Sequence, residues 1–289
     1  FDWLGYDPND ESQVKERERA TSALNLHGVV DSDGDVTTQG IELEGVRHSS
    51  LDWSRVMSQS DQFGCALEIA TFLSFTEQMQ GPLLDNEVGL LAYARYSEGC
   101  MDDLEFYLRI FYHWNSQRDL SGDEKNDWAR SEGLNPKVLC LIEKTRDQGL
   151  NEFVQRTHTH PSERELDLNR LPRMRVVLAQ GMRQWIYVRD TNTDGSQGEY
   201  VPMSELCPCK DPIVIDRGSA CAGNKDMPAF LCVGRRAKGT TIFAQHIVRV
   251  EPAWVTEDKL SSPIAVIALG AELTRRAEGD FSFGMRSRI

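Results

Sequence analysis

The sequence predicts an α+β protein built from several domains, with helices in the first half and a small β structure in the last third. Between residues 51 and 160, apolar side chains repeat every three or four positions, the spacing of a buried helix face. After Pro161, short β-branched runs alternate with glycine-containing turns, which is typical of a small barrel or sandwich. A length of 289 residues suits two or three compact domains.

The first part of the chain predicts a helix followed by a tight chain reversal. Asp10 and Gln13 form a suitable capping pair for a helix over about 12–27. Asp33-Gly34 is a strong turn dipeptide. Helix, hairpin and exit in this order indicate a winged-helix unit, here a partial one. A calcium loop starting at Asp31 is the alternative, but that loop requires glycine at its sixth position, where Val36 stands.

Residues 51–160 predict an all-helical body without a repeat of fixed period. Its helices are separated at four points where glycine, serine or proline interrupts the apolar pattern: Gly81-Pro82, Gly99, Ser121-Gly122 and Asn135-Pro136. Three buried faces are expected, formed by Cys65, Ala66, Ile69, Ala70 and Leu73; by Leu104, Tyr107, Leu108, Phe111 and Trp114; and by Val138, Leu141, Ile142 and Thr145.

The last third predicts short strands over 173–180, 184–189, 200–201, 213–215, 229–233, 240–243 and 247–250. Turn signals at Asp194-Gly195, Gly218, Gly223-Asn224 and Lys238-Gly239 separate them. An apolar tail segment over 261–277 and a loose end over 281–289 follow.

The charge is unevenly distributed along the chain. The formal net charge is −13, with 31 acidic and 15 basic side chains in residues 1–165 and 14 acidic and 17 basic in residues 166–289. An acidic front half argues against broad nucleic-acid binding there, because phosphates are repelled. The mildly basic back half therefore leaves only local patches for phosphate contact.

Seven scattered cysteines favour a reduced, intracellular protein, located in the nucleus or the cytoplasm. No apolar run approaches the roughly 20 residues of a membrane span, and no leader of signal-peptide type is present. The chain begins at Phe1 and enters structure at once, so we expect a fragment of a longer protein.

No catalytic residues are expected in this stretch. The sequence contains no Gly-x-x-x-x-Gly-Lys-Ser/Thr loop, no Asp-Glu-x-His or Asp-Glu-x-Asp motif, no Gly-x-Ser-x-Gly elbow and no His-Glu-x-x-His helix. ATP hydrolysis, and hydrolase activity in general, are therefore not expected of this stretch alone.

Four cysteines and two histidines raise the question of a metal site. Cys207, Cys209, Cys221 and Cys232 fall within 26 residues, and His158 and His160 precede them. Structural zinc sites prefer pairs separated by two to four residues, so this spacing is a weak match. We expect no metal site and ordinary thiols instead.

The best candidates for nucleic-acid contact are cations in the last third. Arg235, Arg236 and Lys238 are expected at a hairpin tip, with Arg217 and Lys225 in neighbouring turns. Trp185 and Tyr187 are expected to offer stacking surfaces for bases. The alternative is an ordinary solvated turn.

Several stretches carry a resemblance to a known family. They are the run A-L-N-L-H-G-V-V-D with G-D-V-T-T-Q-G over 23–40, the run G-C-A-L-E-I-A-T-F-L-S over 64–74, and the stretch over 240–255 that ends in E-P-A-W-V. The chain resembles the region that follows the motor core in DEAH-box and related DExH RNA helicases, as a divergent member. There, the corresponding patterns are A-L-x-x-L-G-A-L-D, G-C-x-x-E-x-L-x-I-A-x-x-L-S and T-x-x-h-h-R-x-h-T-x-h-D-P-x-W-L.

The resemblance implies a domain order. The implied domains are a partial winged helix over 1–48, a helical ratchet-like domain over 49–165, an OB-fold over 166–256 and a tail over 257–289. The OB-fold is expected to begin with a strand at 176–181. It also implies that Lys144 and Arg146, on the ratchet helix, contact RNA.

In that family the region closes the RNA channel and docks partner proteins, while ATP and Mg²⁺ are bound by RecA-like motor domains upstream. The implied partners are single-stranded RNA, those motor domains and an activator protein, with no membrane. Two alternatives stay open: a degenerate scaffold for protein–protein interaction, and an autonomous OB-fold binder of single strands.

Overall fold

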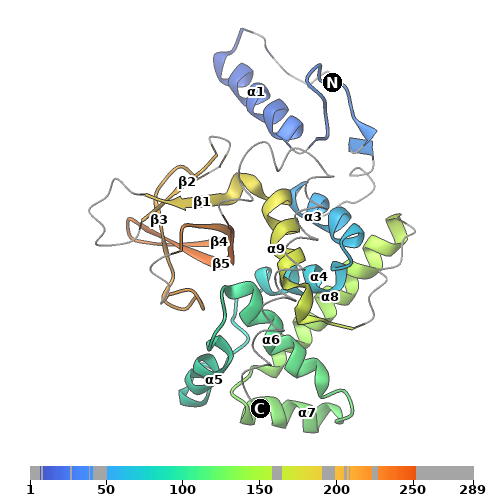
Figure 1. Ribbon diagram of the computed structural model, residues 1–289, viewed down its shortest axis with the longest axis vertical. Helices are drawn as coiled ribbons and strands as arrows, with labels where there is room; N and C mark the ends of the chain where they lie inside the picture. Colours follow the sequence, from blue (N-terminus) through green and yellow to red (C-terminus); the bar gives the residue numbers. More distant parts are fainter. Residues whose placement is uncertain are drawn as a thin grey trace, which may run out of the picture.

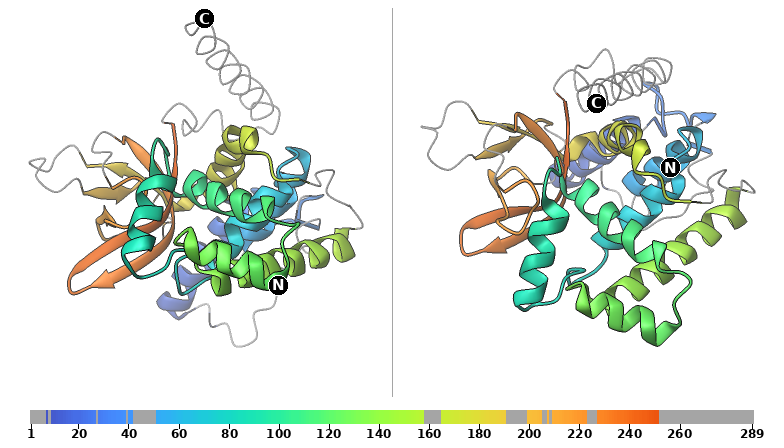
Figure 2. Two further views of the ribbon diagram at one scale, coloured as in Figure 1. Left: turned by 90° about the horizontal axis from the view of Figure 1, so that it is seen from below. Right: turned by 60° about the horizontal axis from the view of Figure 1, so that its bottom comes forward.

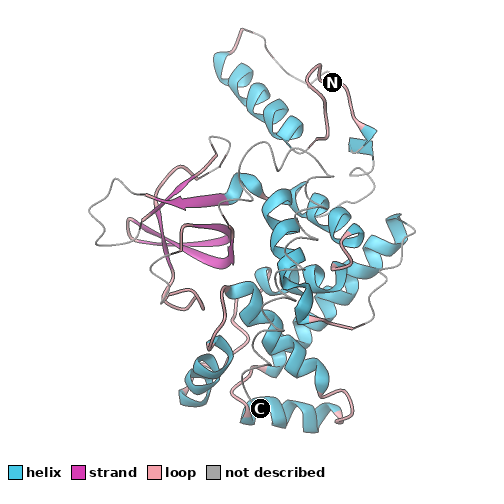
Figure 3. Ribbon diagram, in the orientation of Figure 1, coloured by secondary structure: helices cyan, strands magenta, loops and turns pink. Residues whose placement is uncertain are grey.

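The computed structural model describes residues 7, 9–26, 28–38, 40–41, 51–157, 165–190, 199–204, 207, 209–222 and 227–251. Predictions for the first six residues, for 42–50, for Lys225, for His158 and His160, and for the tail from 252 onward lie outside these residues. Helices fill one side of the molecule and strands the other (Figures 1 and 3).

The N-terminal helix and the turn after it are confirmed. Helix α1 spans Glu11–Leu26, and the carboxylate of Asp10 accepts from the backbone N–H of Ser12 at 2.9 Å and of Gln13 at 3.4 Å. Further on, Val30 and Val36 form an isolated antiparallel bridge around a turn in which Gly34 has φ +86°.

The helical body contains α3 (Leu51–Gln62), α4 (Ala66–Thr76), α5 (Glu87–Ser97), α6 (Asp103–Ser116), α7 (Gly122–Ser131) and α8 (Pro136–Thr157). This confirms the helical prediction for 51–160 as far as residue 157. Helix α4 packs against α3, α6 and α8, and its apolar side chains form the middle of one continuous core. Two of the predicted helix boundaries are confirmed: Ser121 caps α7 in a complete capping box, and Pro136 is the first residue of α8.

The predicted buried faces are confirmed in most positions, with Tyr107 and Thr145 only partly buried and Leu141 exposed. Leu104, Leu108, Phe111 and Trp114 are all buried in α6. Leu141 of α8, however, is 49% exposed, because the buried face of that helix runs through Val138, Leu139 and Ile142 instead.

The strand predicted over 173–180, and with it the opening strand at 176–181, is wrong: this stretch is helix α9 (Leu171–Gly181). Pro172 suits the first turn of a helix, and α9 packs against α3. The β-branched pair Val176-Val177 favours a strand locally, but packing overrides that preference. Short 3-10 turns precede it (η1, Leu168–Arg170) and follow it (η2, Arg183–Trp185).

Five strands form a closed barrel, in the order β1-β2-β3-β5-β4. They are β1 (Ile186–Arg189), β2 (Tyr200–Pro202), β3 (Ile213–Ile215), β4 (Ala229–Lys238) and β5 (Thr241–Arg249). All neighbours pair antiparallel except β3 and β5, which run parallel. The barrel prediction is thus confirmed. The runs predicted over 240–243 and 247–250 form one strand, β5, and β4 is longer than expected.

Alternate residues of the barrel face two different cores. Tyr187, Tyr200, Ile213, Phe230, Cys232, Ala244 and Ile247 fill the barrel interior. Ala229, Leu231, Val248 and Val250 point the other way and join the core of the helical body. The barrel therefore sits on the helices through an apolar face of β4 and β5.

The β4–β5 ladder is interrupted at His246. Cys232 pairs with Ile247 and Gly234 with Gln245, while His246 adopts φ +52°, unusual for a residue with a side chain. Gly234 makes room for this, since a Cβ atom there would lie 2.5 Å from His246 Cδ2. The ring Nδ1 of His246 is 3.0 Å from the hydroxyl of Tyr107 on α6, so the irregularity contacts the helical body.

Helix α5 lies at the edge of the helical body, close to the barrel (Figures 1 and 2). Asn86 caps it by accepting from Gly89 N at 2.9 Å, and the hydroxyl of Tyr93 donates to the carbonyl of Ser219 after β3. Among the described helices, none has the length and apolar character needed to span a membrane.

Gly89→Ala should destabilise the protein by about 1–3 kcal/mol, because a side chain here overpacks a tight site. Its Cβ would lie 1.8 Å from the carbonyl oxygen of Leu84, a backbone atom that cannot move aside freely. Gly122→Ala is the matched control, as a Cβ at Gly122 meets nothing within 4 Å. Urea unfolding of both variants measures the difference, and equal midpoints would contradict the close packing of α5.

Candidate nucleic-acid interface

The cations predicted at a hairpin tip lie mostly within a strand. Strand β4 continues through Lys238, so Arg235 and Arg236 are strand residues rather than turn residues. The reversal itself is at Gly239, whose φ of +63° suits a tight turn. The side chains of Arg235 and Arg236 therefore point to opposite faces of β4.

The guanidinium of Arg235 lies over an aromatic ring. Its register partner is Ala244, a residue of the barrel interior, and its guanidinium lies 4.7 Å from the centre of the Trp185 ring. The indole Nε1 of Trp185 donates to Asp52 on α3 at 3.0 Å. One face of Trp185 is thus covered by Arg235. The predicted stacking role of Tyr187 is wrong, because its side chain is completely buried in the barrel.

Arg236 and Lys238 project from the opposite face of β4 to Arg235. Arg236, 58% exposed, pairs with Asp216 at 2.8 Å. Arg217 follows Asp216 in the turn after β3, and both Arg217 and Lys238 are exposed. We name Arg217, Arg236 and Lys238 the hairpin cluster: three cations with one carboxylate among them. Its net charge of about +2 suits a phosphate backbone.

The two candidates on α8 differ from each other. Arg146 is buried, donates to Asp147 at 2.6 Å and lies 5.1 Å from the centre of the Phe111 ring, so it holds the helix in place. Lys144 is exposed and lies on a groove.

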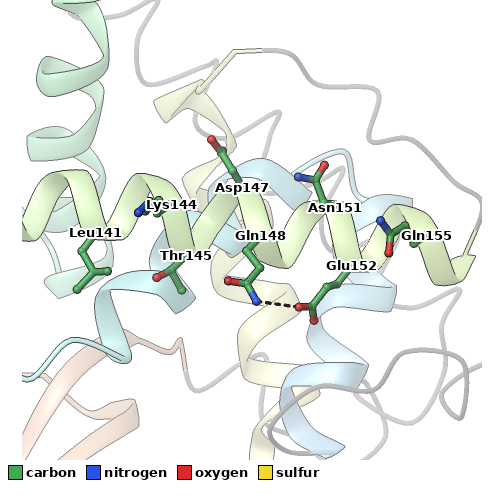
Figure 4. A pocket seen from close by; sticks show the side chains of 8 residues that line it. All are labelled: Leu141, Lys144, Thr145, Asp147, Gln148, Asn151, Glu152 and Gln155. Atoms are coloured by element: carbon green, nitrogen blue, oxygen red, sulfur yellow. Dashed lines mark hydrogen bonds between the residues drawn. The ribbon is translucent and has the colours of Figure 1, made fainter. Parts of the chain in front are cut away.

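This groove has a volume of about 600 Å³, and its lining residues are mostly of polar type (Figure 4). The described residues that line it come from α8 and are Leu141, Lys144, Thr145, Asp147, Gln148, Asn151, Glu152 and Gln155. Gln148 donates to Glu152 at 3.0 Å. The amides at this helical spacing are a signal that the sequence analysis missed, since amide groups bond to bases and to sugar or phosphate oxygens.

The structure does not bring the two groups together. In Figure 1 the β4–β5 hairpin lies at the left of the helical body and α8 at its right. A strand that contacts both must therefore extend across the helical body.

A buried carboxylate at the start of α6 fixes the barrel to the helices. Asp103 accepts from Ile247 N at 2.8 Å, Ala220 N at 2.7 Å and Ser219 Oγ at 2.8 Å, all belonging to the barrel or its loops. Burial raises the pKa of Asp103 to about 6, although these three donors favour the charged form. Asp103 thus joins three barrel groups to one helix end.

The preceding residue forms the second connection. Asp102 caps α6, accepts from Arg249 N on β5 at 3.1 Å, and receives two bonds from Arg175 on α9, at 2.6 and 3.0 Å. Arg175 also donates to Glu105 at 3.2 Å. Burial alone would lower the pKa of Arg175, but the two carboxylates raise it above its ordinary value. Helices α6 and α9 and the barrel are therefore joined at one buried charge cluster.

Two of the buried cysteines donate hydrogen bonds to backbone carbonyls. The thiol of Cys221 donates to the carbonyl of Met101 at 3.4 Å and that of Cys232 to the carbonyl of Gly234 at 3.0 Å. Burial raises the pKa of Cys232 to about 12, so it is protonated at neutral pH. Within the part of the chain that the structure describes, no group of three His, Cys, Asp or Glu side chains is arranged to hold a metal ion.

Neither a comparison with models of protein families nor a comparison with curated proteins finds a match to this chain.

Proposed function

We propose that this chain is the C-terminal module of a divergent DEAH-box or DExH RNA helicase, which closes the RNA channel and docks partner proteins. On this proposal the barrel is an OB-fold and the helical body is the ratchet-like domain. The partial winged helix precedes them, and ATP and Mg²⁺ belong to RecA-like motor domains upstream.

The position of the hairpin cluster carries the proposal. OB-folds bind oligonucleotides with the face of strands 2 and 3 and with the loops after strands 1 and 4. Arg217 follows β3, and Arg236 and Lys238 lie at the end of β4, beside the β4–β5 turn. Arg236 and Lys238 thus lie next to the loop after strand 4, and Arg217 follows Asp216, the ion-pair partner of Arg236. This position supports contact with a single strand.

The chemistry of the hairpin cluster suits binding of single-stranded RNA without regard to its base sequence. Cations bind phosphates, and phosphate contacts position a strand without reading its bases. With one ring face covered by Arg235, Trp185 offers less stacking surface than an open ring. We therefore expect weak, salt-dependent binding of single-stranded RNA.

A scaffold that has lost RNA binding is the second candidate function. Two observations favour it: Asp216 neutralises Arg236, and Asp147 neutralises Arg146. The net charge of −13 points the same way.

A salt titration distinguishes the two functions. The wild-type chain should bind a fluorescent oligouridine with a slope of log K against log salt near −2, from about three contacts at about 0.7 each. Replacing Arg217, Arg236 and Lys238 together by Gln should bring this slope close to zero. A scaffold predicts no salt-dependent binding by the wild-type chain.

The matched control replaces three exposed cations of the helical body, Arg118, Arg130 and Lys137, by Gln. This variant has the same net charge as the hairpin-cluster variant. It should keep the wild-type slope; an equal loss in both variants would show that only net charge matters, against a site at the hairpin.

A further inference from the structure

Helix α5 presents large apolar side chains to solvent. Leu90 and Leu91 are 70% and 71% exposed, and Val88 is 42% exposed. We name these three residues the α5 ridge. Single exposed apolar residues are common on protein surfaces, whereas several large ones on one short helix are a candidate interaction site.

The fold does not need the ridge. The buried residues of α5 are Gly89, Ala92 and Tyr96, so small residues bring the helix close to its neighbours. The polar attachments include an ion pair of 2.6 Å between Arg95 and Glu132, the bond from the Tyr93 hydroxyl to the carbonyl of Ser219, and a contact of 2.6 Å between the Tyr96 hydroxyl and His113 Nδ1. A helix held in this way is presented as a rigid surface, with its leucines turned outward.

The segment that carries the ridge is acidic, although Arg109 of α6 donates to the carbonyl of Glu98 at 2.7 Å. Residues 77–98 contain four acidic side chains and one basic one, and the basic one, Arg95, is already paired with Glu132. Asp85, Glu87 and Glu98 are exposed at the two ends of the helix. Phosphates and anionic membranes are repelled here, and so is a second copy of the same surface, because a two-fold contact would oppose like charges.

We propose that the α5 ridge binds a protein segment of basic amphipathic character, with leucine-like side chains on one face of a helix and Lys or Arg beside them. Such a segment places its apolar face on the ridge, while its cations meet the acidic ends of α5. The α5 ridge would be the surface that docks a partner protein in the proposed function. Peptide binding at the ridge does not depend on RNA binding, so either test can fail while the other succeeds.

The probe is an 18-residue amphipathic peptide of Leu and Lys with leucines at positions i, i+3, i+4 and i+7. Its binding to the chain is measured by fluorescence anisotropy. The wild-type chain should bind it at least tenfold more tightly than Leu90→Gln/Leu91→Gln does. Glutamine keeps the helix preference, and circular dichroism confirms that the variant is folded. Glu87→Lys should weaken the same binding with the ridge left intact.

Leu141→Gln on α8 is the matched control, since this leucine is also about half exposed, and it should bind the peptide like the wild-type chain. Equal affinities of the wild-type chain and the ridge variant would overturn the proposal. So would equal binding of a scrambled Leu/Lys peptide or of a Leu/Glu peptide. Self-association of the wild-type chain that the ridge variant abolishes would overturn it too, because the occupant is then a second copy.

Discussion

Asp102→Ala should lower the free energy of unfolding by about 3–5 kcal/mol, the cost of leaving one partner of a buried ion pair alone. Arg175 is 5% exposed and would retain only its contact of 3.2 Å to Glu105. The same change removes the cap of α6 and the acceptor of Arg249 N. Urea unfolding measures the loss.

A double variant tests the cause of this loss. Adding Arg175→Met to Asp102→Ala removes the unpaired charge, so the double variant should be more stable than Asp102→Ala alone. A single variant that loses less than about 1 kcal/mol would mean that the pair is not buried as described. The connection between barrel and helices would then rest on apolar packing alone.

Acidification should destabilise the chain through His246. Burial lowers the pKa of this imidazole to about 4 from an ordinary value of 6.5. Because the folded value is the lower one, the contribution to stability is complete above pH 6.5 and is lost as the pH falls toward 4. A difference of about 2.5 pKa units corresponds to about 3 kcal/mol.

The comparison variant is His246→Asn, since Asn tolerates a positive φ and does not titrate. Between pH 7 and pH 4, the wild-type chain should lose about 3 kcal/mol relative to this variant. The raised pKa of Asp103 acts in the opposite direction over a similar range, but it is present in both chains and leaves the difference unchanged. Parallel pH profiles of the two chains would show that His246 is not buried in its neutral form.

The sequence predicts those parts of the fold that depend on local patterns. The apolar spacing from Leu104 to Trp114 identified α6, and glycine signals identified the turns at Gly34 and Gly239. Helix α9 was missed because Val176-Val177 favours a strand locally, whereas packing against α3 decides its structure.

The contacts that position the candidate site could not be predicted. Asp103 and Ile247 are 144 residues apart in the sequence, and no local pattern marks them as partners. Likewise, a list of cations does not show that Arg235 covers Trp185 or that Asp216 pairs with Arg236. Whether a cation is available to RNA depends on such neighbours. Among the described cations of the hairpin and its neighbouring turn, Arg217 and Lys238 are exposed, Arg236 is exposed but paired with Asp216, and Arg235 stacks on Trp185.

Photocrosslinking of the full chain to an oligonucleotide of 4-thiouridine, with the crosslinked peptides identified by mass spectrometry, tests the central claim most directly. The account predicts crosslinks within 213–218 and 235–243, which disappear when Arg217, Arg236 and Lys238 are replaced by Gln. Crosslinks confined to α1 or α5, or crosslinks unaffected by that replacement, would contradict it.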